Sequence, residues 1–381
     1  MPKYKFSDIA TNVTEKRMPV PEDKLLYIAP NNLDTDTLTV PEYGYKVDLN
    51  GVKLVMHKGD MLFGRREPQL KKAAIAPHDG LFSAHGMIFH PKKDVILPEF
   101  FPFFIASDYF MDVAIRISVG SLSPTVNWRD LKDVEFEIPS LDVQKRYAEL
   151  LWSVIESKRA YKELIAQTEE LVKAQYIELF GDPVENPMGW PTKPLTDMGD
   201  CKNGMNFKSD DAGITINCLG VGDFKDFDVI EDTAGLSMVS LNSMPSEDYY
   251  LKDGDIVFVR SNGNKTMVGR SVIVFPGDTP TVFSGFCIRY RNKDDSILVP
   301  YLLYVLKADS MRKQMYGRGA NIQNLNQKTL SSLNIPLPPK ELQQSYVDFV
   351  KQSNKAKESL QNSFNQANAM HKAILKEIFP A

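Results

Sequence analysis

Apolar residues along this chain fall into two contrasting patterns. In most of the sequence, β-branched and aromatic residues form short runs bounded by Gly, Asp, Asn and Pro, as at residues 272–275 and 286–290. Runs of this length between turn-forming residues predict strands. Longer apolar segments around residues 99–113 and 300–315 predict helices. The mixture predicts globular regions of the α+β class.

The second pattern is a long segment without turn-forming residues. Residues 141–180 contain neither Gly nor Pro, carry Asp142 in the first turn, and stop at Gly181-Asp182-Pro183. These features predict one helix, roughly 60 Å long at about 1.5 Å per residue. Its apolar residues recur at alternating spacings of three and four, which is the period of a coiled coil.

The same period recurs near the C-terminus, and each copy includes a lysine. We call these positions the helix seam, which comprises Tyr147, Leu151, Val154, Lys158, Tyr161, Ile165 and Val172 in the first segment and Tyr346, Val350, Lys357, Leu360, Phe364 and Ile374 in the second. Matched polar residues in a seam tend to fix the register of pairing. A single amphipathic helix more often packs on its own domain, so pairing of the two helices needs further support.

An internal repeat supplies that support. Pro139 and Pro338 lie 199 positions apart, and the alignment continues without a gap to Phe180 and Phe379. Identical pairs at this offset include Gly120 and Gly319, Asn127 and Asn326, Leu131 and Leu330, Gln144 and Gln343, and Tyr147 and Tyr346. Two similar helices alternate with two related globular regions. The simplest way for both helices to bury their apolar residues is to pack on each other. We therefore predict globular regions at 1–138 and 182–337, and paired helices at 139–181 and 338–381.

Charge argues against a simple DNA-coating protein. The net charge is −4 and the sequence pI about 5.9, whereas DNA-binding domains often exceed a pI of ~9. Positive charge is nevertheless concentrated locally, because residues 256–277 and 310–340 contain no acidic residue but several Arg and Lys. The first half of the chain has a corresponding cluster, formed by Arg65, Arg66, Lys71 and Lys72.

The sequence lacks the motifs of several other protein classes. An apolar leader and a run of ~18 apolar residues are both missing, which predicts a cytosolic protein without a membrane span. The histidines at 78, 85 and 90 lie close together with Asp79, but the second copy keeps none of them, so no metal site is expected. Residues 264–266 lack the glycines of a P-loop, and Asp60 and Asp255 each follow Gly at a strand start, where a turn accounts for them.

Several ordered motifs resemble the specificity subunit of type I restriction-modification systems. In the second copy, residues 319–326 read Gly-Ala-Asn-Ile-Gln-Asn-Leu-Asn and residues 333–344 read Leu-Asn-Ile-Pro-Leu-Pro-Pro-Lys-Glu-Leu-Gln-Gln. The first copy has related segments at 120–128 and 136–144, although Ser140-Leu141 replaces the Pro-Lys that follows Pro338. The exit of the first helix reads Glu-Leu-Phe-Gly-Asp-Pro at 178–183 and is followed by Gly-Trp-Pro at 189–191. The resemblance covers the whole chain.

This resemblance implies an α+β fold with two pseudo-repeated target-recognition domains, separated by two long helices that form an antiparallel coiled coil. Each domain would read half of a split double-stranded DNA target. The implied partners are two modification subunits, which carry S-adenosylmethionine and methylate adenine, and the motor-nuclease subunits of a restriction complex. The chain itself would hold no cofactor, no metal and no catalytic residue.

Two loops are the main candidates for DNA contact. In the second domain, the loop 260–265 offers Arg, Asn and Lys groups suited to base edges, although a solvated hairpin would also account for it. Residues 317–323 could contact phosphates or bases, and the aromatic residues Phe82, Phe283 and Tyr290 are expected in the core. The candidate DNA-binding residues are Arg65, Arg66, Lys71, Lys72, Arg260, Ser261, Asn262, Asn264, Lys265, Arg318, Asn321 and Gln323.

Two other functions remain alternatives at this point. One is a coiled-coil adapter whose globular domains bind protein or glycan ligands, which the acidic pI favours. The other is a self-contained nuclease or methyltransferase, which the absence of an Asn-Pro-Pro-Tyr motif disfavours.

Overall fold

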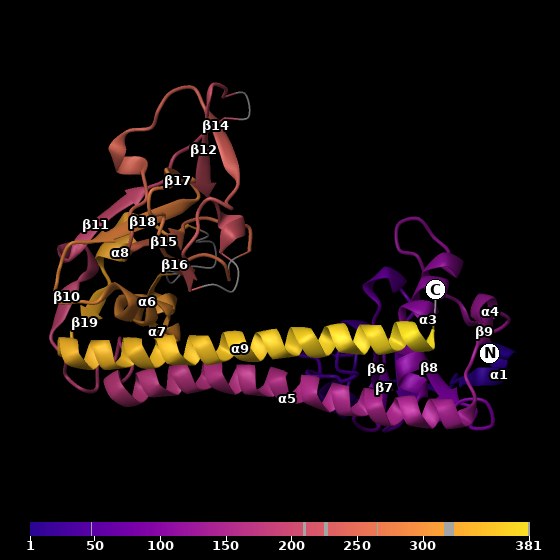
Figure 1. The fold of residues 1–381 in the computed structure, drawn as a ribbon. Helices are drawn as coiled ribbons and strands as arrows, with labels where there is room; N and C mark the ends of the chain where they lie inside the picture. Colours follow the sequence, from indigo (N-terminus) through magenta and orange to yellow (C-terminus); the bar gives the residue numbers. More distant parts are fainter. Residues whose placement is uncertain (47, 209–210, 225–227, 265, 316–323, 380–381) are drawn as a thin grey trace. The chain divides into compact units, whose positions relative to one another are not determined.

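The computed structural model describes residues 1–46, 48–208, 211–224, 228–264, 266–315 and 324–379. The chain divides into two compact units, which we call unit 1 (Met1–Gln167 with Lys357–Ala381) and unit 2 (Thr168–Ala356). Each unit contains one globular region and parts of both long helices, α5 (Leu141–Phe180) and α9 (Lys340–Ile378) (Figure 1). Both predicted helices and the α+β class are thereby confirmed.

Unit 1 contains two small antiparallel sheets and several short helices. The strand orders are β2-β8-β5-β6 and β3-β4-β7, and β1 pairs separately with β9. The strands are β1 (Lys3–Lys5), β2 (Ala10–Asn12), β3 (Lys16–Arg17), β4 (Lys53–Met56), β5 (Met61–Gly64), β6 (Ala73–Ile75), β7 (Gly80–Phe82), β8 (Gly86–Pro91) and β9 (Glu135–Glu137). The short helices are α1 (Phe6–Ile9), α2 (Phe101–Ala106), α3 (Asp108–Ile117) and α4 (Trp128–Leu131), with 3-10 turns at Pro21–Leu25, Pro30–Asn32 and Pro68–Leu70.

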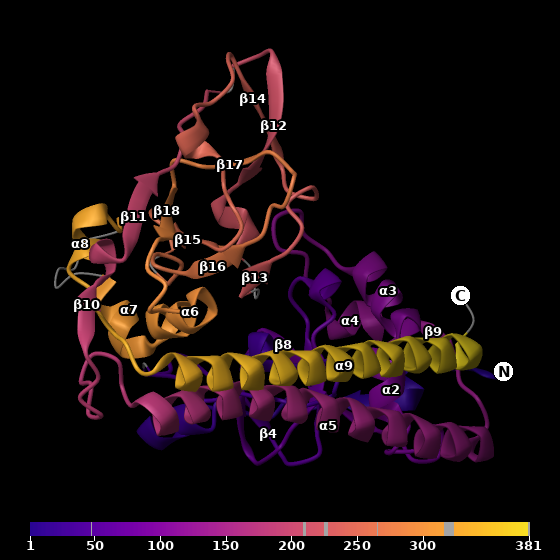
Figure 2. The same ribbon diagram turned by 60° about the vertical axis from the view of Figure 1, so that its left-hand side comes forward.

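Unit 2 repeats this plan with additional strands. Its two larger sheets have the strand orders β11-β18-β15-β16-β13 and β14-β12-β17 (Figure 2). In addition, β10 pairs with β19. The strands are β10 (Thr192–Pro194), β11 (Gly199–Asn203), β12 (Ile214–Leu219), β13 (Val229–Ile230), β14 (Met238–Leu241), β15 (Asp255–Val259), β16 (Ser271–Val274), β17 (Thr281–Phe283), β18 (Cys287–Asn292) and β19 (Asn334–Pro336). The helices are α6 (Val299–Lys307), α7 (Asp309–Met315) and α8 (Gln327–Ser331), with 3-10 turns at Leu195–Asp197, Val221–Asp223 and Glu247–Tyr249. The order β11-β18-β15-β16 matches β2-β8-β5-β6, so the sequence repeat corresponds to a repeated sheet.

The structure differs from the predicted elements at three points. The apolar segments around 99–113 and 300–315 each form two helices, because the backbone becomes extended at Ser107 and at Ala308. The Ser107 hydroxyl then accepts a hydrogen bond from the Phe110 amide (3.2 Å) and begins the next helix. The strand predicted at 286–290 starts at Cys287, which leaves Phe286 in the preceding turn.

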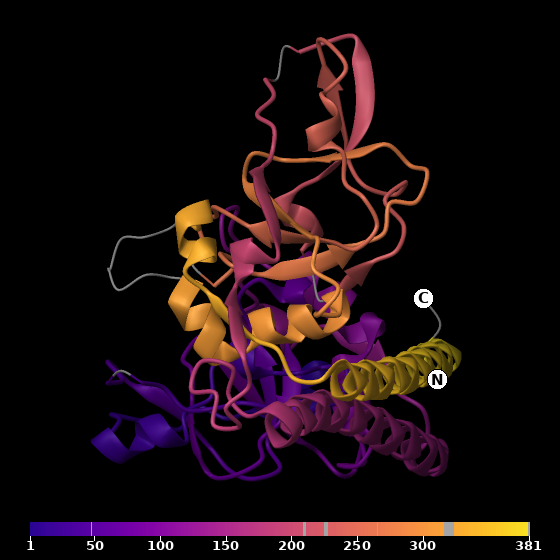
Figure 3. The same cartoon turned by 90° about the vertical axis from the view of Figure 1, so that its left-hand side faces the viewer.

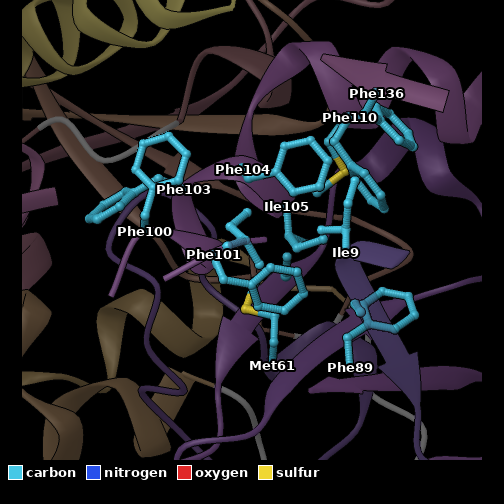
Figure 4. Packing of buried hydrophobic residues seen from close by; sticks show 14 of the residues in the cluster. Ile9, Met61, Phe89, Phe100, Phe101, Phe103, Phe104, Ile105, Phe110 and Phe136 are labelled. Atoms are coloured by element: carbon cyan, nitrogen blue, oxygen red, sulfur yellow. The ribbon is translucent and has the colours of Figure 1, made fainter. Parts of the chain in front are cut away.

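The core of unit 1 is rich in phenylalanine. Figure 4 shows rings from α2 packed with Met61 of β5 and Phe89 of β8. The end of α9 and the residue that follows it complete this core: Phe379 is buried, and its ring centre lies 5.7 Å from that of Phe104 and 5.3 Å from that of Tyr109. The last turns of α9 therefore contribute to the core of unit 1.

Unit 2 uses the end of α5 in the same way. Phe180 is buried, with its ring centre 4.9 Å from that of Tyr301 and 5.5 Å from that of Tyr346. Gly181 then stops the helix with a φ of +73°, and a Cβ atom there would lie 2.4 Å from Pro187. Because Phe180 and Phe379 are a repeat pair, each core is closed by the helix that begins in the other repeat.

The start of each long helix is fixed by a buried glutamine. Gln144 accepts a hydrogen bond from the Leu97 amide (2.7 Å) and donates to the carbonyls of Val95 (2.9 Å) and Pro139 (2.8 Å). Gln343 makes the corresponding three bonds, accepting from the amide of Leu298 (2.8 Å) and donating to the carbonyls of Ser296 (3.0 Å) and Pro338 (2.8 Å). Both side chains are fully buried. Each glutamine thus ties its helix to its own globular region.

The two long helices pack together with opposite directions. In unit 1 the Tyr147 hydroxyl, near the start of α5, bonds to Glu377 near the end of α9 (2.6 Å). In unit 2 the Tyr346 hydroxyl, near the start of α9, donates to the Val172 carbonyl of α5 (3.2 Å). Figures 1 and 3 show the helices side by side. The start of each helix therefore contacts the end of the other, as an antiparallel pair requires.

All of the helix-seam residues are buried or half-buried. Lys158 is fully buried, and its Nζ lies 6.0 Å from the centre of the Phe364 ring and has no hydrogen-bond partner among the described residues. Burial lowers the pKa of this lysine. Its repeat counterpart Lys357 is only half-buried, so the two lysines differ in environment.

Replacing Gln343 by Leu tests the glutamine anchor. The substitution removes the partner of the Leu298 amide, of the Ser296 carbonyl and of the buried Pro338 carbonyl, so we expect a loss of about 2–4 kcal/mol in the free energy of unfolding. Urea denaturation followed by circular dichroism measures this loss. Gln344→Ala is the control because the neighbouring side chain is exposed and donates a hydrogen bond to Asp348 (2.9 Å) on the same helix. Equal denaturation midpoints for the two variants would contradict the anchoring role.

His371 should make the stability of unit 1 depend on pH. Burial and, to a smaller extent, the charge of Lys158 lower the pKa of this histidine from 6.5 to about 4, although Asp36 opposes the shift. Between pH 6.5 and 4 this histidine is mostly protonated in the unfolded chain and mostly neutral in the folded chain. The free energy of unfolding therefore falls as the pH drops through this window. The loss is on the order of 2–3 kcal/mol. Denaturation midpoints of His371→Leu should fall less over this window than those of the wild type, whereas the exposed-site control His57→Ala should follow the wild type.

Candidate nucleic-acid interface

The predicted basic cluster of unit 1 follows strand β5 directly. The Arg65 carbonyl accepts a hydrogen bond from the Val126 amide (2.9 Å), and Arg66 forms an antiparallel bridge with Thr125. These contacts join the arginine pair to the segment that precedes α4. Arg66 is exposed and Arg65 half-buried.

The predicted loop of unit 2 has the same backbone arrangement. The Arg260 carbonyl accepts from the Leu325 amide (2.8 Å), and Ser261 forms an antiparallel bridge with Asn324. Val126 and Leu325 lie 199 positions apart, so the hydrogen bond recurs at the offset of the sequence repeat. Arg65 and Arg260 are therefore structural counterparts.

The asparagines of the second loop use their carbonyl oxygens to hold the loop. Asn262 Oδ1 accepts from the Asn264 amide (2.7 Å), and Asn264 Oδ1 accepts from the amide (3.1 Å) and hydroxyl (2.9 Å) of Thr266. Each asparagine also has an amide nitrogen that can donate to a base. Arg260 donates from Nη1 to the Gly285 carbonyl (3.2 Å), which restrains the guanidinium at the end of β15. Restrained Arg and Asn side chains suit bidentate contacts with guanine and adenine edges.

The two lysines of the unit 1 cluster have partners within the unit. Lys71 Nζ lies 2.5 Å from a carboxylate oxygen of Asp108 and 3.3 Å from one of Asp112. Lys72 Nζ donates to the Leu33 carbonyl (3.2 Å). Contact of Lys71 with DNA would require it to leave these carboxylates, so Arg65 and Arg66 are better placed to meet a ligand.

Four of the candidate residues lie outside the described part of the chain, namely Lys265, Arg318, Asn321 and Gln323. Their contribution stays a prediction.

The structure adds three residues to the candidate site. The Lys72 carbonyl accepts from Gly64 at the end of β5 (2.8 Å), and the Arg270 carbonyl accepts from Val259 at the end of β15 (2.9 Å), which makes Arg270 the counterpart of Lys72. The other two residues are His85 and Phe286, which are exposed in the turns before β8 and β18. The acid-free run at 256–277 contains Arg270 and could have indicated it. The two exposed rings give no such signal, because only the strand pairing places them beside the arginines.

The protonation of His85 reflects the basic character of this surface. Burial lowers its pKa, and the positive charges of Arg66, Arg65 and Lys53 lower it further. His85 is therefore neutral near pH 7, while the arginines beside it keep their charge. Concentrated positive charge of this kind attracts phosphate groups.

The acidic and histidine residues considered for catalysis or metal binding make other contacts. Asp60 accepts from the His57 amide (2.8 Å) and lies 2.6 Å from His90 Nε2, whereas Asp255 forms a two-point ion pair with Arg291 (2.7 Å each). The described residues contain no group of three or more Asp, Glu, His or Cys arranged to hold a metal ion. Within the same residues, no helix has both the length and the apolar character of a membrane span.

Comparison with known proteins identifies relatives along the whole chain. Residues 187–368 match the family described as the type I restriction modification DNA specificity domain. The chain is 24% identical over 400 residues to the type I restriction enzyme StySPI specificity subunit of Salmonella potsdam, which covers 94% of this chain and 82% of that protein.

Solved structures share the fold. A chain from a study of complex assembly and conformational transition of the type I R-M system has a TM-score of 0.59 and 20% identity, with 99% of this chain and 97% of that chain covered. The type I restriction-modification S subunit from M. genitalium has a TM-score of 0.56 and 14% identity, with 100% and 96% covered. The fold, the repeat and these relatives together confirm the predicted resemblance to type I restriction-modification specificity subunits.

Proposed function

We propose that this chain is the DNA sequence-specificity subunit of a type I restriction-modification complex and reads a bipartite target. One observation carries the proposal: the same loop scaffold, an arginine at the end of a central strand bonded to the segment before a short helix, occurs once in each unit. The scaffold is the same but its side chains differ, because Arg65-Arg66-Glu67 stands where the second unit has Arg260-Ser261-Asn262. Two such loops can read two different half-sites.

The chemistry of methylation and cleavage belongs, in this proposal, to other subunits. Two modification subunits, one for each repeat, would bring S-adenosylmethionine and transfer its methyl group to adenine. Restriction subunits would add DNA translocation and cleavage. The twofold repeat of the chain supports two copies of the modification partner. The similarity to type I restriction enzyme specificity subunits favours this function over the adapter and over a self-contained enzyme.

Methylation mapping tests the proposal directly. Co-expression of the chain with the modification subunit of its own system should methylate adenine in one split sequence, and the purified chain alone should methylate no DNA. Sequencing that detects N6-methyladenine reports the motif. If a complex assembles but no split motif is methylated, the proposal is wrong.

The two arginine loops should govern different half-sites. Arg260→Ala removes a restrained guanidinium, so we expect specific affinity to fall on the order of 10- to 100-fold, with relaxed selection in one half-site only. Arg65→Ala with Arg66→Ala should relax the other half-site. Binding of the assembled complex to duplexes that vary one half-site at a time measures both effects.

Lys252→Ala is the matched control, because this exposed lysine lies just before β15, at the opposite end of the strand from Arg260. It should leave both half-sites unchanged. Loss of both half-sites together in the Arg260 variant would contradict the assignment of one loop to each half-site.

A further inference from the structure

Phe286 is an apolar residue in an unusual position. Its side chain is 62% exposed, although the surrounding aromatic residues Phe283 and Tyr290 are fully buried. It occupies the turn between β17 and β18, directly beside Arg260. A single exposed apolar residue is common on protein surfaces, so exposure alone does not indicate a role.

The backbone beneath this ring is fixed on several sides. The Phe286 carbonyl accepts from the amides of Arg260 (2.7 Å) and Ser261 (3.3 Å), and its own amide donates to the Ser284 hydroxyl (3.3 Å). The Cys287 amide closes the turn by donating to the Ser284 carbonyl (2.8 Å). The exposed ring therefore stands on a turn that can move little.

Gly285 shows how tightly the turn is packed. The residue is buried, its amide donates to the Met205 carbonyl (2.6 Å), and a Cβ atom there would lie 2.1 Å from Asn206 Oδ1. The turn thus fixes the backbone at Phe286, because the residue before it is packed against a neighbouring segment. The position from which the exposed ring extends is therefore well defined.

Unit 1 has the same turn with a different ring. Gly86 donates to the Ser83 carbonyl (3.0 Å) and the His85 amide donates to the Ser83 hydroxyl (3.2 Å), as at Ser284 in unit 2. Strand pairing places Gly86 opposite Gly64 and Cys287 opposite Val259. His85 and Phe286 therefore occupy equivalent positions, each beside the arginine that follows the central strand. Both units present an exposed planar ring next to a guanidinium.

We propose that Phe286 inserts between neighbouring bases of one half-site as a wedge, while Arg260 binds the adjacent base edge or phosphate. This deepens the proposed function and rests on it. Apolar side chains that enter a base step partly unstack it and bend the duplex. Contact with a thymine methyl group needs only an adaptable apolar surface. Insertion between bases instead requires a backbone that resists displacement, and the turn at Ser284 provides such a backbone. His85, which is polar and neutral, contacts the other half-site without entering the base stack.

The experiment uses the chain assembled with its modification subunits and the target defined by methylation mapping. Base stacking on an aromatic side chain contributes about 1–3 kcal/mol, so Phe286→Ala should weaken binding to the intact target about 5- to 150-fold. Phe286→Trp should keep most of the binding. Phe275→Ala is the matched control, because Phe275 is 37% exposed and lies just after β16, at the opposite end of the β15–β16 pair from Arg260.

Two readouts separate a wedge from a merely structural role. First, the affinities of wild type and Phe286→Ala are measured for a series of duplexes, each with a single abasic position at a different place in the half-site. At the wedge step the two proteins should bind with nearly equal affinity, because that step is already unstacked. Second, the fluorescence of a 2-aminopurine placed beside that step should increase when wild type binds and should not change when Phe286→Ala binds.

Wild-type binding by Phe286→Ala would overturn the proposal. Weaker binding that no abasic position relieves, without a change in 2-aminopurine fluorescence, would also overturn it and would indicate a groove contact. These outcomes differ from failure of the proposed function, in which the wild-type complex itself methylates no split motif.

Discussion

The fold depends on the way each long helix is fixed at both ends. A buried glutamine ties the start of the helix to the globular region that precedes it, and a buried phenylalanine places the end in the core of the other unit. An unpaired buried amide or carbonyl is costly, and loss of a buried phenylalanine leaves a large cavity. A helix held in this way cannot slide along its partner without losing contacts in two cores. The antiparallel pairing therefore follows from the anchors as well as from the helix seam.

The residues that carry the packing are separate from the loops of the candidate interface, which explains why this interface can differ between the two units. The anchors, the central strands and the turns with Ser83 and Ser284 recur in both copies, because they carry the packing. The loops after β5 and β15 are held to the rest of the fold mainly by backbone hydrogen bonds, which almost any side chain permits. The two copies can therefore present different groups to a ligand while they keep one scaffold. Such an arrangement suits a protein that must read two unrelated sequences.

Much of the architecture was predictable because local sequence patterns determine it. The absence of Gly and Pro between 141 and 180 gives α5 with its observed bounds, and the 199-residue offset gives the repeated units. The contacts of individual candidate residues were not predictable. Lys71 is paired with Asp108 and Asp112, which lie 37 and 41 positions away, and only the folded chain brings them together.

The aromatic residues were missed for a different reason. A strand boundary displaced by one residue decides whether Phe286 belongs to a buried strand or to an exposed turn, and strand propensity does not resolve a single position. Gly285 is the residue that could indicate the exposed turn, because its lack of a side chain permits the close packing beneath that turn. A glycine before an aromatic residue at a strand start is a weak signal in one copy. The paired serines at 83 and 284 strengthen it, since the same turn precedes both rings.

The acidic charge of the whole chain does not oppose DNA reading, because the charges are segregated along the central strands. Asp60 directly precedes β5 and Asp255 is the first residue of β15, and they are paired there with His90 and Arg291. Arg65 and Arg260 follow the opposite ends of the two strands. A strand of four or five residues is roughly 15 Å long at about 3.3 Å per residue. This exceeds the screening length of about 8 Å at physiological salt. A phosphate at the loop end therefore experiences the charges of the arginines and little of those of Asp60 and Asp255.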